Sequence, residues 1–192
     1  MLRVHTDPRV YGPEEDTYFL LETLKKEDLS GYGLEIGVGT GLIALNICHL
    51  FEEFTGVDIN PQAVTLARKN AQENNIDCQF LESDLFSNIS SPFDVIIFNP
   101  PYIPADEECK SVEDLSYHGG EDGRQTIDQF LSQFGQYLNP GGRVYLLQSS
   151  LSGIDETSAL LKTMEYAFHI IARQKLFFEE LVVFKIVKEE LL

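Results

Sequence analysis

The chain has 192 residues, 43% of them hydrophobic, and its 31 acidic and 14 basic side chains give a formal net charge of −17. This length and apolar content predict one globular domain over residues 1–192 and exclude a disordered chain. The acidic surface repels phosphate backbones, so we expect no direct binding of nucleic acid and a basic protein or basic loop as the better partner.

The sequence shows neither a targeting signal nor a metal-binding pattern. No apolar stretch is long enough to span a membrane, and the N-terminus lacks the apolar core of a secretory signal, which predicts a cytoplasmic protein or one that also enters the nucleus. The three cysteines, Cys48, Cys78 and Cys109, lie far apart and form no Cys-x-x-Cys pair. The four histidines show no metal-ligand spacing either, so we expect no bound metal.

Strand-like apolar runs alternate with helical patterns along most of the chain, which is typical of an α/β fold with a parallel sheet. Asn60 and Pro61 mark one helix start, as N-cap and first helical residue. The last two strands are joined by a link too short for a helical crossover, so they should pair antiparallel. In chain order we expect an N-terminal arm, a helix over 13–26, a strand over 33–38, a helix over 42–51, a strand over 54–59, a helix over 61–73, strands over 78–81 and 93–98, a long irregular stretch over 103–123, a helix over 126–138 ended by residues 139–142, a strand over 143–147, a helix over 154–166, and strands over 168–172 and 180–186.

Three glycines, Gly37, Gly39 and Gly41, lie between the first expected strand and its helix. Glycines at such a turn permit positive φ and let a ligand approach bare backbone. A dinucleotide fingerprint would place its third glycine at the position of Leu42, so the spacing weakens a pyrophosphate-binding interpretation. A nicotinamide-dependent oxidoreductase is therefore disfavoured, although this register alone does not decide between cofactors.

Acidic residues follow the second and third expected strands at the same edge of the sheet. Asp58 closes the second strand, where a carboxylate can accept hydrogen bonds from both hydroxyls of a ribose. Every nucleoside cofactor has a ribose, so Asp58 does not separate nicotinamide cofactors from S-adenosylmethionine. After the third strand, Asp84 could reach an adenine amino group, with Leu85 against the ring face. Ordinary turn or helix-capping aspartates would look the same in sequence.

The tetrapeptide Asn99-Pro100-Pro101-Tyr102 directly follows the apolar run 93–98. The run predicts a strand buried on both faces, and two successive prolines end it because neither donates to a ladder. The residue before a proline is pushed away from helix, so Asn99 is held extended at the carboxyl end of the strand. Ligands of open α/β sheets bind at that end, so we expect the tetrapeptide at the active site.

Together these motifs resemble those of a class I S-adenosylmethionine-dependent methyltransferase. Asn-Pro-Pro-Tyr is similar to the motif of amino-methyltransferases that modify planar nitrogens, in adenine or in the glutamine amide of release factors. The chain most resembles the HemK-type glutamine methyltransferases of the short archaeal and eukaryotic branch. The implied fold is a Rossmann-like, seven-stranded, mostly parallel sheet with an antiparallel C-terminal hairpin and helices on both faces. Further segments that carry the resemblance are 10–17, the Gly-Gly-x-x-Gly-Arg at 119–124, and the strand pair at 172–174 and 179–181.

The resemblance implies S-adenosyl-L-methionine as cofactor, in a pocket to which the N-terminal arm and helix (residues 1–30) contribute. Glu35 would bind the methionine ammonium, directly or through water, which would explain a carboxylate at the end of an apolar strand. The Asn99 oxygen and the Pro100 carbonyl would accept the two protons of the substrate NH₂, while Tyr102 packs against the flat amide. The implied cofactor-binding residues are Thr17, Glu35, Gly37, Gly39, Asp58, Asp84, Leu85 and Asn99, and the implied catalytic residues are Asn99, Pro100 and Tyr102.

The implied reaction is methylation of the glutamine amide in the Gly-Gly-Gln loop of a class I peptide-chain release factor, in translation termination. Methylation of a protein (histone) lysine, or of adenine in nucleic acid, is the alternative. A catalytically idle binding module fits the intact set of pocket motifs poorly. The short branch works with a small zinc-binding activator protein, which would dock on the edge strand 78–81 and extend the sheet in a heterodimer.

Two departures from the family pattern concern contacts with the substrate. The bacterial enzymes carry a helical N-terminal domain that grips the release factor, and only a short segment precedes the first strand here. The branch usually has Trp-Ala before Gly119, where this chain has Tyr117 and His118. The contacts of this loop with a substrate are therefore left open.

Overall fold

The computed structural model describes residues 2–102 and 122–188. The expectations for Cys109, for the Tyr117-His118 pair and for Gly119 and Gly120 concern residues outside these two ranges. None of the helices within the ranges has the length and apolar content that a membrane crossing requires.

Helices and strands alternate through the described ranges, as the sequence pattern predicts. The helices are α1 (Glu15–Leu24), α2 (Leu42–Ile47), α3 (Pro61–Asn74), α4 (Gln125–Gln133) and α5 (Ile154–Thr163), with short 3₁₀ turns η1 (Cys48–Leu50), η3 (Phe134–Gln136) and η4 (Ser150–Ser152). The strands are β1 (Tyr32–Ile36), β2 (Glu53–Asp58), β3 (Gln79–Glu82), β4 (Phe93–Phe98), β5 (Leu138–Ser149), β6 (Ala167–Lys175) and β7 (Glu180–Val187).

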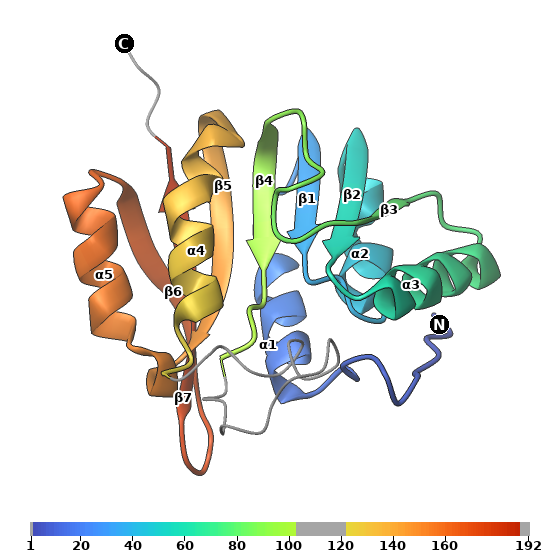
Figure 1. Cartoon of the computed structure of the whole chain (residues 1–192), viewed down its shortest axis with the longest axis horizontal. Helices are drawn as coiled ribbons and strands as arrows, with labels where there is room; N and C mark the ends of the chain where they lie inside the picture. The colour runs from blue at the N-terminus through green and yellow to red at the C-terminus, as the bar shows by residue number, and fades with distance from the viewer. Residues whose placement is uncertain (1, 103–121, 189–192) are drawn as a thin grey trace.

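The strands form one seven-stranded sheet in the order β3-β2-β1-β4-β5-β7-β6. Strands β1 to β5 are parallel, and β7 pairs antiparallel with both β5 and β6 (Figure 1). The predicted mostly parallel sheet with an antiparallel C-terminal hairpin is therefore confirmed. The order also places β3 at one edge, as predicted, and β6 at the other.

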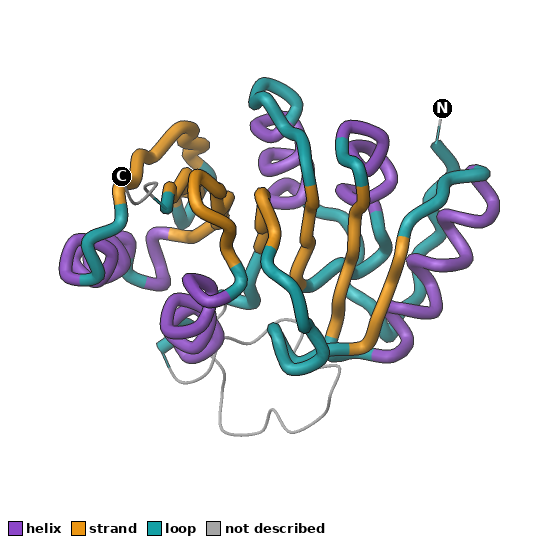
Figure 2. The backbone as a smooth tube through the Cα atoms, turned by 90° about the horizontal axis from the view of Figure 1, so that it is seen from above, coloured by secondary structure: helices purple, strands orange, loops and turns teal. Residues whose placement is uncertain are grey.

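Strand β4 shows why the sheet is covered on both faces. Its residues Val95 and Ile97 face the core cluster that contains α1, α2 and α3, whereas Ile96 and Phe98 face the cluster that contains α4 and α5. All four side chains are at most 2% exposed. A continuous apolar run with a side-chain period of two buries both faces in this way. Figure 2 shows the helices on the two sides of the strands.

Helix α3 begins where Asn60 and Pro61 predict and is capped at both ends. The Asn60 side chain accepts a hydrogen bond from the Gln62 N–H, and Pro61 occupies the first helical position. At the other end Asn75 adopts a left-handed conformation with φ 55°, and its N–H bonds to carbonyls of the last turn. The cap fixes the direction in which the chain leaves β2, and therefore the place of Asp58 at the end of that strand.

Three helix ends predicted from the sequence are wrong, and one of them belongs to the helix expected over 154–166, which ends at Thr163. The helix expected over 42–51 ends at Ile47 and continues only as η1, and the helix expected over 126–138 ends at Gln133 and continues as η3. Residues 139–142, expected to separate helix from strand, lie inside β5. There the Gly141 N–H donates to the Lys188 carbonyl, and the Gly142 carbonyl accepts from the Lys188 N–H. Backbone pairing with the end of β7 outweighs the local turn signal, at the cost of a register shift against β4.

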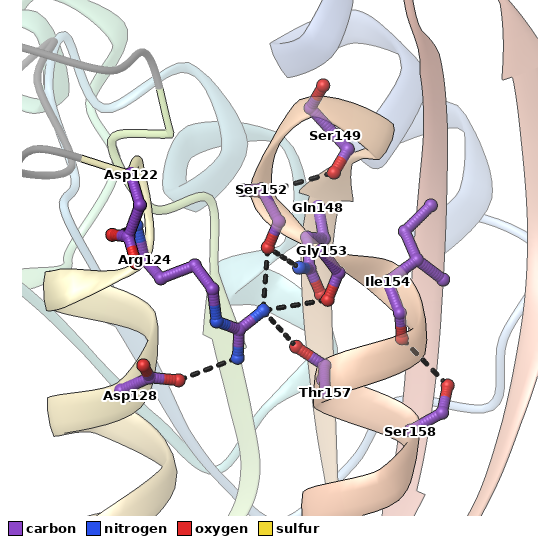
Figure 3. Close-up of polar contacts among 10 residues, drawn as sticks. All are labelled: Asp122, Arg124, Asp128, Gln148, Ser149, Ser152, Gly153, Ile154, Thr157 and Ser158. Carbon is purple, nitrogen blue, oxygen red and sulfur yellow. Dashed lines mark hydrogen bonds and ion pairs between the residues drawn. The ribbon is translucent and has the colours of Figure 1, made fainter.

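Arg124 ties the start of α4 to the turn between β5 and α5 (Figure 3). Its Nη1 donates to the carbonyl oxygens of Ser152 and Gly153, at 2.6 and 2.7 Å, and to the Thr157 hydroxyl at 3.1 Å. Its Nη2 forms an ion pair with Asp128 at 2.6 Å. The side chain of Arg124 is only 12% exposed, so these hydrogen bonds form largely out of water.

The preceding residue, Gly123, lies against the backbone of Tyr102. It has φ +72°, and a Cβ built on it would come within 2.4 Å of the Tyr102 carbonyl oxygen. Any larger residue would push that carbonyl away. The Gly-Arg pair therefore fixes α4 against both the end of the Asn-Pro-Pro-Tyr segment and the turn after β5.

We expect Arg124→Met to lower the free energy of unfolding by about 2–3 kcal/mol, because it keeps apolar bulk but removes charge-assisted hydrogen bonds to buried carbonyls. Urea denaturation measures the change. Asp128→Asn is the matched control: the Asp128 side chain is 51% exposed, so loss of this ion pair should change the free energy of unfolding by less than about 0.5 kcal/mol. Equal losses in the two variants would show that the carbonyl contacts contribute nothing.

Candidate active site

A cavity of about 400 Å³ lies at the carboxyl ends of β1, β2, β3 and β4. This volume is in the range of small-molecule sites. The N-terminal arm and α1 contribute lining residues, including Tyr11 and Thr17, and the start of α4 contributes three more. All eight residues that the sequence predicted to hold the cofactor line the cavity, namely Thr17, Glu35, Gly37, Gly39, Asp58, Asp84, Leu85 and Asn99.

The glycine loop after β1 is pinned to the end of β2. Gly37, Gly39 and Gly41 all have positive φ, which the turn between β1 and α2 requires. The Gly39 N–H donates to Asp58 Oδ2 at 2.9 Å. This hydrogen bond holds the loop backbone along one wall of the cavity, where a ligand meets main chain.

Asp58 is a buried carboxylate with both oxygens hydrogen-bonded. Its Oδ1 accepts from the Asn60 N–H at 2.9 Å, and its Oδ2 accepts from Gly39. Burial raises the pKa of Asp58, while hydrogen bonds from the N–H groups of Asn60, Gly39 and Ile59 act in the opposite direction. Each oxygen keeps a further lone pair, so the carboxylate can still accept the two hydroxyls of a ribose.

Glu35 lies deeper in the cavity wall and lacks a partner on one oxygen. The residue is 4% exposed, and its Oε2 has no hydrogen-bond partner within the described residues. Burial raises the pKa of Glu35 well above its usual value; a hydrogen bond from Ala44 opposes the shift and the charge of Asp58 adds to it. A cationic group in the cavity would stabilise the ionised form of this carboxylate.

The turn after β3 presents Leu85 to the cavity from a left-handed backbone. Leu85 has φ 46° and is 5% exposed. The Ser83 hydroxyl holds the turn, because it donates to the Leu85 carbonyl at 2.9 Å and accepts from the Asn88 N–H at 3.0 Å. Buried Leu85 and exposed Asp84 thus lie next to each other at the cavity, one apolar and one acidic.

Asn99 is oriented by a carboxylate that the sequence analysis did not single out. Its Nδ2 donates to Asp16 Oδ2 at 2.9 Å. The Asn99 Oδ1 is buried and has no hydrogen-bond partner within the described residues. Because an ionised carboxylate only accepts, Asp16 fixes which end of the Asn99 amide faces it. The free oxygen of Asn99 is left for a donor in the cavity.

Asp16 is itself held by neighbours on the N-terminal segment. Its Oδ1 accepts from the Tyr11 hydroxyl at 3.0 Å, from the Thr17 N–H at 2.6 Å and from the Thr17 hydroxyl at 3.2 Å. The residue is 5% exposed, which is rare for an aspartate at the start of a helix. Asp16 lies in the segment 10–17, which carries part of the family resemblance. However, acidic residues are common in the first turn of an ordinary helix, so nothing in the sequence distinguished Asp16 from such a residue.

The other two residues predicted to be catalytic lie beside the cavity. From the tetrapeptide, Asn99 and Pro101 are among the described lining residues, whereas Pro100 and Tyr102 are not. Pro100 is buried and Tyr102 is half-buried. Burial raises the pKa of the Tyr102 hydroxyl, and the negative charges of Asp16, Glu179 and Glu14 add to the shift. The roles assigned to Pro100 and Tyr102 stay predictions.

The cavity suits S-adenosylmethionine by its size and by its donors and acceptors. It has a carboxylate at the end of β2 with lone pairs left for ribose hydroxyls, an unpartnered buried carboxylate oxygen that could accept from an ammonium group, and exposed glycine backbone beside them. Together with the strand order, these features define a class I S-adenosylmethionine-dependent methyltransferase. The chain belongs to the methyltransferase small domain family, whose model matches residues 1–178.

Two similar proteins are named for methylation of glutamine, and one similar structure belongs to a complex that methylates a translation termination factor. A Methanocaldococcus jannaschii protein, described by inference as a protein N5-glutamine methyltransferase, is 47% identical over 188 residues, which cover 95% of this chain and 92% of that protein. The release factor glutamine methyltransferase of Deinococcus radiodurans is 34% identical over 76% of this chain and 56% of its own length. In the E. cuniculi Mtq2–Trm112 complex, responsible for methylation of the eRF1 translation termination factor, a chain superposes with a TM-score of 0.77 at 27% identity, covering 94% of this chain and 99% of that one.

The raised pKa of Glu35 predicts pH-dependent binding of S-adenosylhomocysteine, which carries the ammonium group without the reactive methyl. At a pH below its raised pKa, Glu35 is protonated in the free protein. Pairing with the ammonium then requires Glu35 to lose its proton, which costs free energy at that pH. Affinity should therefore increase with pH, by up to about tenfold per pH unit, and level off above that pKa.

Isothermal titration calorimetry from about pH 5.5 to pH 8 would measure this dependence. Glu35→Gln keeps the shape but cannot ionise, so its affinity should be lower by about 10- to 100-fold at the upper pH and should change less with pH. Asp58 remains in both proteins and provides the common background. Parallel pH profiles for the two proteins would rule out Glu35 as the partner of the ammonium.

Proposed function

We propose that this methyltransferase modifies the side-chain amide nitrogen of the glutamine in the Gly-Gly-Gln loop of a class I peptide-chain release factor. One observation carries the proposal: the buried, unpartnered Oδ1 of Asn99 at the cavity. A fixed acceptor at this place matches a substrate whose reacting nitrogen carries two N–H donors. The M. jannaschii and D. radiodurans relatives are named for glutamine methylation. These names favour a glutamine amide over adenine, the other planar nitrogen considered.

A carboxamide nitrogen is a weak nucleophile because its lone pair is delocalised into the carbonyl group. The bound cofactor supplies an electrophilic methyl group on a sulfonium. The contribution of the chain is then to hold the nitrogen in line and to exclude water. In the proposed arrangement Asn99 Oδ1 accepts one N–H of the substrate, the Pro100 carbonyl accepts the other, and Tyr102 packs against the amide plane. The two prolines keep the acceptor pair rigid.

Asp16 is the positioning residue of this arrangement. With Asp16 as acceptor, the NH₂ of Asn99 is already used and its oxygen must face the substrate. If the Asn99 amide were reversed, two donors would oppose each other and the substrate would lose its acceptor. Asp16 touches Asn99 and not the substrate, so it acts through the orientation of the Asn99 side chain.

We further propose that a small zinc-binding activator protein docks on β3 and forms a heterodimer with this chain. Strand β3 pairs with β2 alone within the described part of the sheet. Three of its four residues are exposed, including Leu81 at 39%. An uncovered edge of this kind can accept a further strand. The similar E. cuniculi structure is itself a complex of two proteins. Because the proposed substrate is a release factor, the proposed compartment is the cytoplasm, and the chain would also enter the nucleus.

Methyl transfer from radiolabelled S-adenosylmethionine tests the substrate assignment. Wild-type chain with its activator should label the release factor and leave its Gly-Gly-Gln loop Gln→Ala variant unlabelled. A histone tail and a DNA fragment with adenine, assayed alongside, represent the two alternative nitrogens. Equal labelling of the release factor and its Gln→Ala variant would overturn the assignment, and so would labelling of the histone or the DNA in place of the release factor.

Asp16→Asn tests the positioning role. The new amide can present NH₂ to Asn99 and stabilise its reversed orientation, so kcat should fall by about 100-fold, while the affinity for S-adenosylhomocysteine changes by less than about tenfold. The arm residue Asp7, whose side chain is 26% exposed and pairs with Arg9, is not among the described lining residues of the cavity and provides a control of the same chemistry, so Asp7→Asn should leave kcat unchanged.

A double-mutant cycle separates positioning from general damage to the fold. If Asp16 acts through Asn99, Asp16→Asn should cost little further activity in an Asn99→Ala background. Additive losses from the two substitutions, or a kcat for Asp16→Asn within threefold of wild type (a factor of about 3 is under 1 kcal/mol), would contradict the role proposed for Asp16.

A further inference from the structure

Two adjacent phenylalanines are exposed to solvent at the tip of the β6–β7 hairpin. Phe177 is 91% exposed and Phe178 is 85% exposed, more than any other large hydrophobic side chain in the described ranges. Their rings meet edge to face, with centroids 4.5 Å apart and an interplanar angle of 81°. Exposed aromatic side chains in contact with each other are typical of a protein contact site, because burying them in a partner is strongly favourable.

The hairpin tip is held by hydrogen bonds to itself and to the end of β5. The Leu176 N–H donates to the Glu179 carbonyl at 2.8 Å and closes the turn. The Glu180 N–H donates to the Ser150 hydroxyl at 2.9 Å, and the Ser149 hydroxyl bonds to the Glu179 carboxylate. The phenylalanine pair is therefore presented in a set position, which lowers the entropy cost of binding.

The tip lies on the active-site side of the sheet. Because β7 is antiparallel to both neighbours, β6 runs in the direction of β5, and its last residue lies at the carboxyl edge. Figure 1 shows the hairpin extending beyond the end of β4, on the side to which β4 points. The charge of Glu179, next to Phe178, acts on the hydroxyl of Tyr102. The aromatic pair thus lies on the same side of the sheet as the active site, next to a carboxylate whose charge acts on Tyr102.

We propose that Phe177 and Phe178 form a docking site for the protein substrate, a proposal that rests on the proposed function. The pair would contact apolar side chains of the substrate in a basic segment near the methylated loop. Charge complementarity supports this partner, because the chain has a net charge of −17 and the charges of Glu179 and Glu14 act on Tyr102, while Glu180 beside the tip is paired with Arg173. The activator is not the occupant: its proposed strand, β3, is at the opposite edge of the sheet from β6.

The test is the Phe177→Ser/Phe178→Ser double variant, assayed with the activator on the release factor. Both side chains are almost fully exposed, so the fold should not change. We expect the KM for the release factor to increase by about 10- to 100-fold, with kcat at saturation and the affinity for S-adenosylhomocysteine unchanged. Tyr32→Ser/Leu50→Ser is the matched control, since these residues are 43% and 41% exposed near the amino ends of β1 and β2, and it should leave KM unchanged.

The outcomes separate the docking site from the function. If wild-type chain labels the release factor and the double variant keeps the wild-type KM, the docking proposal fails and the proposed function stands. If wild-type chain does not label the release factor, the proposed function fails and the docking proposal fails with it. Sedimentation adds one further outcome: a wild-type dimer lost in the double variant, with KM unchanged, would assign the pair to a second copy of this chain and overturn the proposal.

Discussion

The carboxylate of Asp16 is the contact on which the geometry of the active site depends. It accepts hydrogen bonds from Tyr11, from the N–H and hydroxyl of Thr17, and from the amide of Asn99. Those donors come from the N-terminal arm, from α1 and from the end of β4. One buried acceptor therefore joins three segments and sets the rotamer of the residue with the free amide oxygen. Burying a carboxylate is costly without partners, and four donors offset that cost.

The cavity shows how a parallel sheet creates a site at its carboxyl edge. Strands β1, β2 and β4 are buried on both faces and end together, so Glu35, Asp58 and Asn99 converge there although they are far apart in sequence. Two of the three buried side-chain atoms without a partner in the described residues, Glu35 Oε2 and Asn99 Oδ1, belong to cavity-lining side chains. Unmet acceptors of this kind cost stability in the free protein and are ready for the donors of a ligand.

The proposed contacts with other proteins divide along the sheet. Strand β3 forms one edge and is the surface proposed for the activator, whereas the β6–β7 hairpin at the other edge carries the bare aromatic pair. Between them, Gly123 and Arg124 hold α4 against the backbone of Tyr102 and the turn after β5. In the proposed arrangement the activator and the docking segment of the substrate would use opposite edges of the sheet, on either side of the cavity in which the substrate amide meets the cofactor.

The sequence by itself determined the α/β class, the seven strands and the antiparallel C-terminal pair, and the eight residues that it predicted to bind the cofactor all line one cavity. The fold follows from local chemistry, namely side-chain period, prolines that stop a strand and a short final connection, whereas the set of eight residues came from the resemblance of the motifs to a known family. The start of β5 did not follow, because pairing with the end of β7 outweighed the local turn residues, and α2 and α4 end earlier than expected in 3₁₀ turns. Only the tertiary structure brought Asp16 to Asn99, 83 residues away in sequence, and Arg124 to Ser152 and Gly153. Such contacts depend on how whole elements pack, and no local pattern encodes the partner that a buried polar group will meet.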